Sequence, residues 1–415
     1  MSTWKEYTVA DIVSTVIDYR GKTPKKLGGD WSDSGYRALS AKNIKTGKIV
    51  QPDSIRCVSE DMYKAWMKEE IQREDIFITS EAPFGQIYFW DSDEKIVLSQ
   101  RLFAIRVNGQ FYPKYIYFYM TSSFFQAELD GRATGTTVVG LRQPELLKCK
   151  VLAPSYEEQR VIAETLWCLE QKINHNEEIN NNLEQQAQAL FKEWFINNSE
   201  NVDWETGTFN GLIQSTLNGD WGKESPIGNN TEKVYCIRGA DIPEVNAGNK
   251  GKMPTRYILS KNLANKKLEA GDIVVEISGG SPTQSTGRCT VITQSLLDRY
   301  DSSMLCTNFC KAIKPRTGYS LFIYYYWQYL YEKGVFFSYE NGTTGIKNLD
   351  FSGFIETEPI FIPPIDKVQA FDDYCKSIFN QVFANGKQSE QIALLREILL
   401  PKLMSGELDV SEIDL

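Results

Sequence analysis

Histidine is almost absent from this chain, and cysteine occurs without the spacing that marks metal sites. The 415 residues include one histidine, His175, and eight dispersed cysteines that form no CxxC pair. Cys306 and Cys310 are the one close pair, so the sequence indicates no zinc site and fits free thiols in a reducing compartment. A single histidine also excludes most triad and acid-base mechanisms. His175 lies between two asparagines, as expected of a solvated helix residue.

Membrane, export and nucleotide signals are missing as well. No run of about 18 apolar residues occurs, and residues 1–10 lack a charged and then apolar signal pattern, so we expect a cytoplasmic protein without a membrane partner. There is no GxxxxGK[ST] motif, and no glycine-rich adenosylmethionine loop follows a predicted strand. Residues 80–84 read SEAPF, which departs from the [DNS]PP[YFW] tetrapeptide of amino-methyltransferases, and the second copy has GGSP at 279–282. We therefore expect no catalysis, metal or cofactor in this chain.

What the chain has is an internal repeat. Residues 116–119 (IYFY) and 135–137 (GTT) recur at 323–326 (IYYY) and 342–344 (GTT), each displaced by 207 positions. Shorter matches continue the repeat, such as EDIFI at 74–78 with GDIVV at 271–275. A constant offset over such a span is the signature of duplication. Each copy is a globule followed by a helix.

The segments that follow from the repeat are two globules and two helices. We predict globules at residues 1–154 and 199–362, a central helix at 155–198 and a C-terminal helix at 363–415. With 42% hydrophobic residues the chain can bury sizeable cores. Short β-branched runs at 76–79 and 273–276, further predicted strands at 95–107 and 304–313, and aromatic helices at 114–120 and 320–331 predict a mixed α/β fold. Most aromatics, including Tyr324, Tyr325 and Tyr326, are interpreted as packing.

The acidic surplus, a net charge of −9, lies in the two helical segments. Residues 1–150 hold 21 basic and 19 acidic residues and residues 199–360 hold 16 and 18, so the globules are near neutral. Residues 151–198 hold 3 basic and 8 acidic residues, and residues 361–415 hold 5 and 9. Phosphate would repel the helices, whereas a neutral globule can still present a basic face. The globules are therefore the candidates for binding nucleic acid.

The first helix begins at a capping box, Ser155 with Glu158, and would be roughly 60 Å long if it reaches residue 197. Both helices carry an apolar seam with alternating spacings of four and three residues, as in a coiled coil. Each seam is polar at its centre, with Asn176 and Asn180 in the first and Asn385 and Ser389 in the second. Two globules related by a two-fold axis need antiparallel helices, and the polar centres would then meet. A helical hairpin that only completes the core is the alternative. The predicted seam and register residues are Ile162, Leu169, Ile173, Asn176, Leu183, Leu190, Ile378, Val382, Asn385, Ile392 and Leu399.

Basic and small polar residues gather in loops of the globules. Residues 20–26 (RGKTPKK) place four cations around glycine and proline, so they form an exposed loop that could contact phosphates or guanine edges. A solvated loop, or a structural turn at the Gly-Thr-Thr motifs, is the alternative. Residues 218–223 (NGDWGK) of the second copy are far less basic, so the two globules would bind unlike sequences. The candidate DNA-binding residues are Arg20, Lys22, Thr23, Lys25, Lys26, Lys42, Arg132, Thr136 and Thr137 in the first globule, and Lys223, Arg238, Lys250, Lys252, Arg256, Thr343, Thr344, Lys347 and Asn348 in the second.

Taken together, these features resemble the DNA sequence-specificity subunit (HsdS) of type I restriction-modification systems. The resemblance covers nearly the whole chain and rests on the order globule, helix, globule, helix. It also rests on the RGKTP loop at 20–24, the Gly-Thr-Thr turns, the LAP and IPP motifs at 152–154 and 362–364 with Gln159 and Gln369 after them, and LLPKLMSGEL at 399–408. None of these motifs is diagnostic alone, but their order and duplication are specific.

The resemblance implies a division of labour. Each target-recognition domain would read one half of a split double-stranded DNA target, and the antiparallel helices would set the gap. Two methyltransferase (modification) subunits would dock on the helices, and a restriction-translocation subunit would complete the nuclease. Adenosylmethionine and ATP would bind only to those partners. Two alternatives remain, a stand-alone DNA adenine methyltransferase with its own recognition repeat and a coiled-coil scaffold that does not bind DNA.

Overall fold

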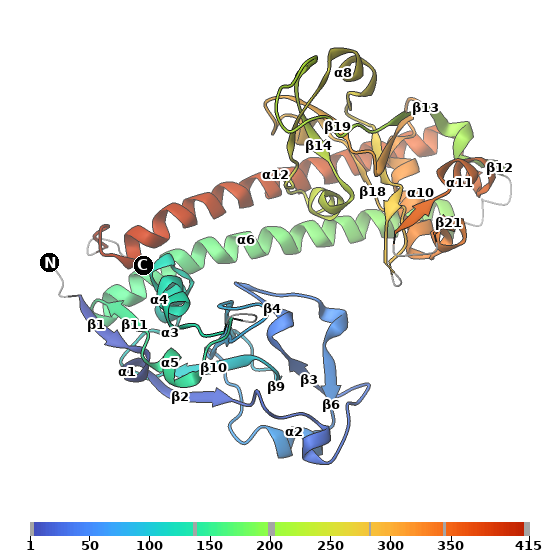
Figure 1. Ribbon diagram of the computed structural model, residues 1–415. Coiled ribbons are helices and arrows are strands. Elements are labelled where there is room, and N and C mark those ends of the chain that lie inside the picture. The colour runs from blue at the N-terminus through green and yellow to red at the C-terminus, as the bar shows by residue number, and fades with distance from the viewer. Residues whose placement is uncertain (1–3, 136–138, 198–203, 282–283, 343–345, 411–415) are drawn as a thin grey trace. The chain divides into compact units, whose positions relative to one another are not determined.

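The computed structural model describes residues 4–135, 139–197, 204–281, 284–342 and 346–410 (Figure 1). It divides into two compact units. Unit 1 comprises Met1–Gln171 and Ala393–Leu415, and unit 2 comprises Lys172–Ile392. The predicted mixed α/β class is confirmed, since each unit combines short sheets with helices.

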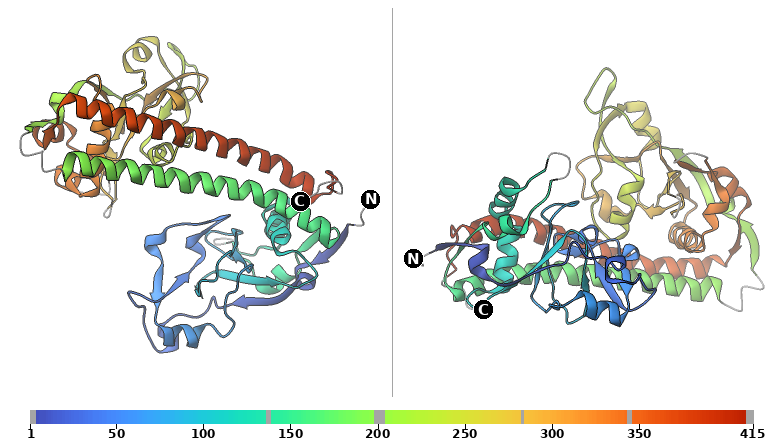
Figure 2. Two further views of the ribbon diagram at one scale, coloured as in Figure 1. Left: turned by 180° about the vertical axis from the view of Figure 1, so that it is seen from behind. Right: turned by 60° about the horizontal axis from the view of Figure 1, so that its bottom comes forward.

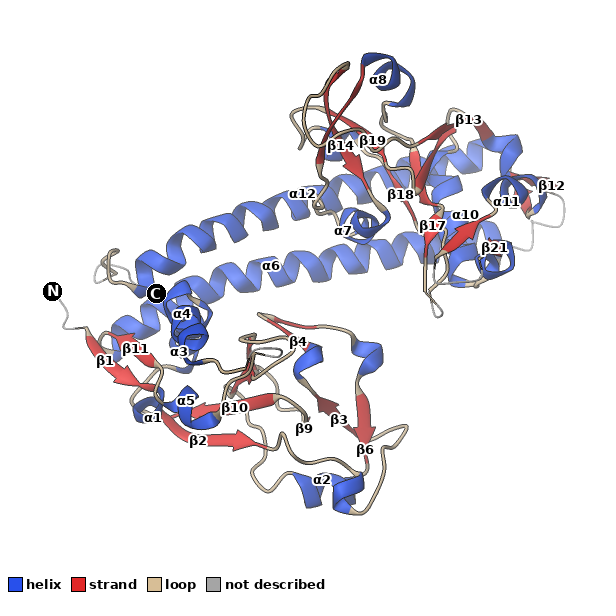
Figure 3. Cartoon of the chain, viewed as in Figure 1, coloured by secondary structure: helices blue, strands red, loops and turns tan. Residues whose placement is uncertain are grey.

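Unit 1 is built on a four-stranded antiparallel sheet and a smaller three-stranded sheet (Figure 3). The four-stranded sheet has the order β2-β10-β7-β8, and the three-stranded sheet has the order β6-β3-β9, in which β3 and β9 are parallel. The elements are β1 Lys5–Thr8, α1 Val9–Ile12, β2 Val13–Asp18, β3 Tyr36–Leu39, β4 Ile44–Lys45, β5 Lys48–Ile49, β6 Arg56–Val58, α2 Glu60–Trp66, β7 Ile76–Thr79, β8 Ile87–Phe89, β9 Val97–Leu98, β10 Leu102–Val107, α3 Pro113–Thr121, α4 Ser123–Arg132, α5 Gln143–Leu147 and β11 Lys150–Ala153.

Unit 2 repeats this plan. Its four-stranded sheet has the order β13-β20-β16-β18 and its three-stranded sheet the order β15-β14-β19, again with one parallel pair, β14 with β19. The elements are β12 Glu205–Thr208, β13 Ile213–Asn218, β14 Asn230–Ile237, α7 Ile242–Asn246, β15 Thr255–Leu259, α8 Ser260–Lys266, β16 Ile273–Glu276, β17 Ser278–Gly279, β18 Cys289–Val291, α9 Gln294–Leu297, β19 Ser303–Cys306, β20 Cys310–Pro315, α10 Ser320–Glu332, β21 Glu340–Asn341, β22 Lys347–Leu349, α11 Phe351–Thr357 and β23 Pro359–Ile362. The repeat in the sequence is thus a repeat of topology.

Two stretches predicted as single strands are each two strands. Residues 95–107 form β9 and β10, and residues 304–313 fall in β19 and β20, with a tight turn between the strands of each pair. The prediction was wrong because the two strands of each pair belong to different sheets, so the chain must change direction between them. Arg101 in the first turn has a positive φ of 62°, a backbone conformation that alternation of apolar residues does not reveal.

The two long helices are α6, Tyr156–Phe191, and α12, Ile365–Met404. The predicted capping box is present, since the Ser155 hydroxyl and amide donate to Glu158 at 2.7 and 3.2 Å. A π-helical turn, Lys192–Ile196, continues α6. Among the described residues, neither these helices nor any shorter one has a stretch apolar enough to cross a membrane.

Within unit 2 the two helices run antiparallel and side by side (Figures 1 and 2). The Asn176 amide donates to the Ser389 hydroxyl at 3.1 Å, and the Asn385 amide donates to the Asn180 carbonyl at 2.9 Å. Since residue numbers rise on α6 as they fall on α12, the predicted antiparallel pairing of polar centres is confirmed. Within unit 1 the same orientation holds, with Arg396 paired to Glu170. No predicted seam residue is exposed: Ile162, Asn176, Ile378, Val382 and Asn385 are buried, and Leu169, Ile173, Leu183, Leu190, Ile392 and Leu399 are half-buried.

Candidate nucleic-acid interface

The cationic loop at residues 20–26 is tied to the body of unit 1. Arg20 donates from Nε and Nη2 to Asp18 at 2.9 and 2.8 Å and from Nη1 to the Leu141 carbonyl at 3.1 Å. Its guanidinium also lies 3.8 Å above the ring of Phe103. Lys22 donates to the Trp66 carbonyl at 2.7 Å, and burial lowers the pKa of its ammonium. These contacts give both cations an architectural role.

We expect the double change Arg20→Ala and Lys22→Ala to lower the free energy of unfolding by about 1 to 3 kcal/mol, because Asp18 and two carbonyls lose their donors. If the chain reads DNA half-sites, as the resemblance implies, the half-site sequence should stay unchanged. Thermal unfolding and methylation-site mapping measure the two effects separately. A new or relaxed half-site in a folded variant would show instead that this loop reads DNA.

The other predicted cations divide into paired and free groups. Arg132 pairs with Glu128, Arg238 with Asp241, Arg256 with Glu224 and Lys347 with Glu340, while the ammonium of Lys26 donates to the Gly21 carbonyl. Lys250 lies over the ring of Tyr300. The Thr23 hydroxyl accepts from the Lys26 amide, and Asn348 pairs through its backbone with Ser278. Among the candidate cations in the described ranges, the side chains that make no hydrogen bond, ion pair or ring contact are those of Lys25, Lys42, Lys223 and Lys252. Thr136, Thr137, Thr343 and Thr344 lie outside the described residues.

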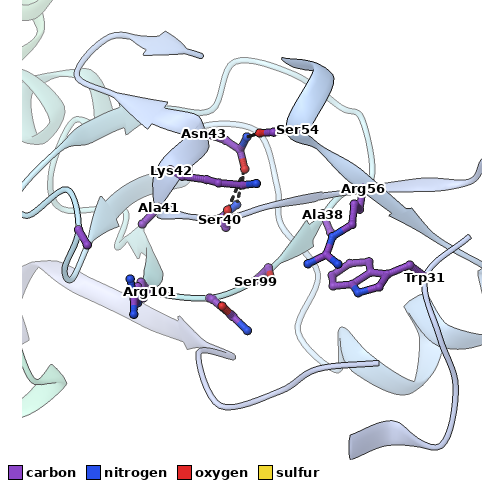
Figure 4. A pocket seen from close by; sticks show the side chains of 12 residues that line it. Trp31, Ala38, Ser40, Ala41, Lys42, Asn43, Ser54, Arg56, Ser99 and Arg101 are labelled. Carbon is purple, nitrogen blue, oxygen red and sulfur yellow. Dashed lines mark hydrogen bonds between the residues drawn. The ribbon is translucent and has the colours of Figure 1, made fainter. Parts of the chain in front are cut away.

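A polar pocket of about 220 Å³ lies in unit 1 where β3, β6 and the turn between β9 and β10 converge. We call it the unit 1 pocket. Figure 4 shows Arg56 and Trp31 on one side of it and Lys42 and Arg101 on the other. Its lining residues are Trp31, Ala38, Ser40, Ala41, Lys42, Asn43, Ser54, Arg56, Ala82, Ser99, Gln100 and Arg101. Only Lys42 of this set was a candidate from the sequence.

Unit 2 has a pocket of about 480 Å³ at the same place in its own sheet. This unit 2 pocket lies beyond the end of β14, the counterpart of β3, and beside the turn between β19 and β20. Its lining residues are Trp221, Arg238, Gly239, Ala240, Glu276, Ser278, Thr307, Asn308 and Phe309. The backbone bonds agree too, since the Ser99 amide donates to the Leu39 carbonyl at 2.8 Å and the Thr307 amide to the Ile237 carbonyl at 3.0 Å. The two pockets are therefore counterparts within the repeat.

A tryptophan that lines each pocket has an arginine stacked on it, and Arg56 lines its pocket whereas Arg256 does not. The Arg56 guanidinium lies 3.8 Å from the ring centroid of Trp31, and the Arg256 guanidinium lies 3.9 Å from that of Trp221. Each arginine lies on the strand that pairs with the central strand of the three-stranded sheet, β3 or β14. Each tryptophan lies in the loop before that central strand. Stacking fixes the plane of a guanidinium and leaves its N–H edge available.

The linings of the two pockets differ in charge. The unit 1 pocket presents Lys42, Arg56 and Arg101, and of these only Arg101 has an acidic partner among the described residues, Glu81 at 2.9 Å. In the unit 2 pocket Arg238 is held by Asp241, and Glu276 by Arg288. The other side chains that line the unit 2 pocket are uncharged. One shared scaffold thus presents two chemically unlike surfaces.

All eight cysteines are free thiols, and burial raises the pKa of several, that of Cys310 to about 12. Over the described part of the chain no cluster of histidine, cysteine and carboxylate residues could hold a metal ion.

Comparison with known proteins gives a consistent result. Residues 1–185 match the family model described as the type I restriction modification DNA specificity domain. The chain is 25% identical over 376 residues to the type I restriction enzyme MjaIX specificity subunit of Methanocaldococcus jannaschii, covering 86% of this chain and 83% of that protein. It is 25% identical over 205 residues, 47% of this chain and 41% of that protein, to the HindI specificity subunit of Haemophilus influenzae. The crystal structure of a type I restriction-modification S subunit from M. genitalium has the same fold, with a TM-score of 0.59, 14% identity and coverage of 97% of this chain and 96% of that one.

The two units are therefore two copies of one scaffold, each with its own pocket and each joined to a long helix. The resemblance predicted from the sequence is confirmed by these matches. The chain is similar to specificity subunits of type I restriction-modification systems over most of its length.

Proposed function

We propose that this chain reads a bipartite, asymmetric double-stranded DNA target, one half with each unit, for a type I restriction-modification complex. The observation that supports this is the pair of matched pockets with unlike linings. A shared scaffold would approach both half-sites in the same way, while different side chains would read different base edges in the major groove. The target would therefore be two unlike half-sites separated by bases that are not read.

The segments predicted from the sequence would divide the work. Residues 1–154 and 199–362 would be the target-recognition domains, and residues 155–198 and 363–415 the helices that set the gap. The acidic surplus of the helices suits protein partners better than phosphate. Two methyltransferase subunits would dock there, joined by a restriction-translocation subunit, and adenosylmethionine and ATP would bind to those partners. A methyltransferase partner would flip the adenine that it modifies.

The free lysines are expected to supply phosphate contacts. Replacing Lys25 and Lys223 by alanine should weaken binding to all DNA sequences alike and should reduce the slope of log K against log salt by roughly one for each lysine. Titrations of the whole complex at several salt concentrations measure the slope. Lys64→Ala is a matched control, because Lys64 is an exposed lysine paired with Glu60 on α2. A changed sequence preference with an unchanged slope would place Lys25 and Lys223 on bases instead.

The proposed function is tested by selecting binding sites from randomised DNA pools with the chain in complex with its methyltransferase. We expect enrichment of one motif with two unlike, separated parts. A single uninterrupted site, or no sequence preference of the complex, would refute the proposal. Binding of adenosylmethionine by this chain alone would favour a stand-alone methyltransferase.

A further inference from the structure

Arg56 is held by stacking on Trp31, and the N–H groups of its guanidinium have no acceptor among the described residues. Its guanidinium stacks 3.8 Å from the Trp31 ring, and among the described residues no carboxylate or carbonyl accepts from it. The side chain is exposed and lines the unit 1 pocket (Figure 4). An arginine presents donors in a fixed fork, and stacking removes much of the rotational freedom that would be lost on binding. This edge is ready to meet a pair of acceptors.

The corresponding arginine in unit 2, Arg256, does not have a free hydrogen-bonding edge. Arg256 stacks on Trp221 in the same manner, but its Nη1 donates to Glu224 at 2.9 Å and only 10% of its side chain is exposed. With Nη1 bonded to Glu224 and its Nε buried, Arg256 does not present a free donor edge to a base. The stacked arginine is therefore available for hydrogen bonding in unit 1 and unavailable in unit 2.

The unit 2 pocket presents an amide and an aromatic ring instead. Asn308 and Phe309 occupy the turn that holds Gln100 and Arg101 in unit 1. Phe309 is 61% exposed, and the exposed Asn308 side chain makes no hydrogen bond within the described residues. The charged groups around them are already neutralised by Asp241 and Arg288.

We propose that Arg56 reads a guanine in the half-site of unit 1 and that Asn308 and Phe309 read an A·T pair in the half-site of unit 2. Guanine offers O6 and N7 as two acceptors, which an arginine fork matches. Adenine offers N7 as acceptor and N6 as donor, which an asparagine amide matches, and the thymine methyl group packs against an apolar side chain. This assignment rests on the proposed function of the two units.

The unit 1 part is tested with Arg56→Gln and Arg56→Lys in the complex with the methyltransferase, by sequencing methylated sites in a library with randomised half-sites. Both changes should reduce discrimination at one G·C position of one half-site by about 5- to 150-fold, the range that corresponds to one bidentate contact. Lysine keeps the charge but loses the fork, so a lysine variant that discriminates like wild type would show a phosphate contact and overturn the assignment. Arg37→Gln is the control, because Arg37 lies on β3 and pairs with Glu94.

The unit 2 part is tested with Asn308→Ala and Phe309→Ala in the same library. Each should relax one A·T position in the half-site that Arg56 variants leave intact. Phe361→Ala is the control, since Phe361 is an exposed aromatic on β23. Relaxation at a G·C position, in the same half-site as Arg56, or at no position would overturn this part. If wild type itself shows no two-part motif, the proposed function fails, and not merely the base assignment.

Discussion

Replacing Gly386 by alanine is expected to lower the free energy of unfolding of unit 2 by about 3 kcal/mol, although alanine normally stabilises a helix relative to glycine by about 1 kcal/mol. Gly386 lies inside α12 against a loop of unit 2. A Cβ atom there would lie 1.9 Å from the carbonyl oxygen and 2.5 Å from the carbonyl carbon of Gly248. Both are backbone atoms, so the loop or the helix must move.

Gly131→Ala is the matched control for this change. Gly131 also lies in a helix, α4, but it is exposed and a Cβ atom would meet nothing within 4 Å. We expect that variant to gain about 0.5 to 1 kcal/mol. Chemical unfolding followed by circular dichroism measures both. Equal effects of the two substitutions would show that the Gly248 loop is not packed against α12.

The Gly386 contact matters for recognition because the same loop fastens the unit 2 globule to the helices. The Asn180 amide donates to the Ala247 carbonyl at 3.1 Å and to the Val382 carbonyl at 3.1 Å. The polar seam is thus shared between the two helices and the globule. A Gly386→Ala complex that still folds is expected to lose discrimination in the unit 2 half-site first.

Replacing Arg106 by alanine should destabilise unit 1 by about 3 to 5 kcal/mol, because it leaves a buried carboxylate without its partner. Asp75 is fully buried just before β7, and Arg106 on β10 donates to its two oxygens at 2.9 and 3.0 Å. Unit 2 has the same arrangement, with Lys314 donating to Asp272 at 3.0 and 3.2 Å. Exposed Arg73, paired with Asp93, is the control, and Arg73→Ala should change stability little.

The loss of unfolding free energy caused by Arg106→Ala is expected to depend on pH. Burial raises the pKa of Asp75 above its ordinary value of 3.8 even with Arg106 present. A carboxyl whose pKa is raised on folding favours the folded state when protonated, and that contribution is lost as pH rises through the raised pKa. The difference in free energy of unfolding between the variant and wild type should therefore become smaller as pH falls from neutral to about pH 4. A gap that widens at low pH, or that Asp75→Asn fails to reduce at neutral pH, would contradict this explanation.

Features with a local origin could be predicted from the sequence. The capping box at Ser155 and the polar centres at Asn176 and Asn385 follow from residue types at fixed spacing on one helix. The duplicated topology followed from matching segments at a constant offset. In each case the physical cause lies within a few residues or within a repeat, where a single sequence displays it.

The candidate pockets could not be predicted in the same way. Trp31 and Arg56 meet because a bridge between Ser32 and Cys57 brings the loop before β3 against β6, which no local pattern reveals. The loop at residues 20–26 was predicted to contact DNA because its cations are dense, and that stays a prediction. The hydrogen bond from Arg20 to the Leu141 carbonyl, 121 residues away, could not be predicted in this way. The four free lysines, Lys25, Lys42, Lys223 and Lys252, were all candidates from the sequence.

The central claim is that one duplicated scaffold reads two unlike half-sites. The most direct measurement is the modified-adenine motif of cells that express this chain with its methyltransferase, determined by sequencing native DNA. We predict a motif of two different half-sites, each with a modified adenine, separated by a fixed number of unread bases. A palindromic motif, or an uninterrupted one, would contradict the account.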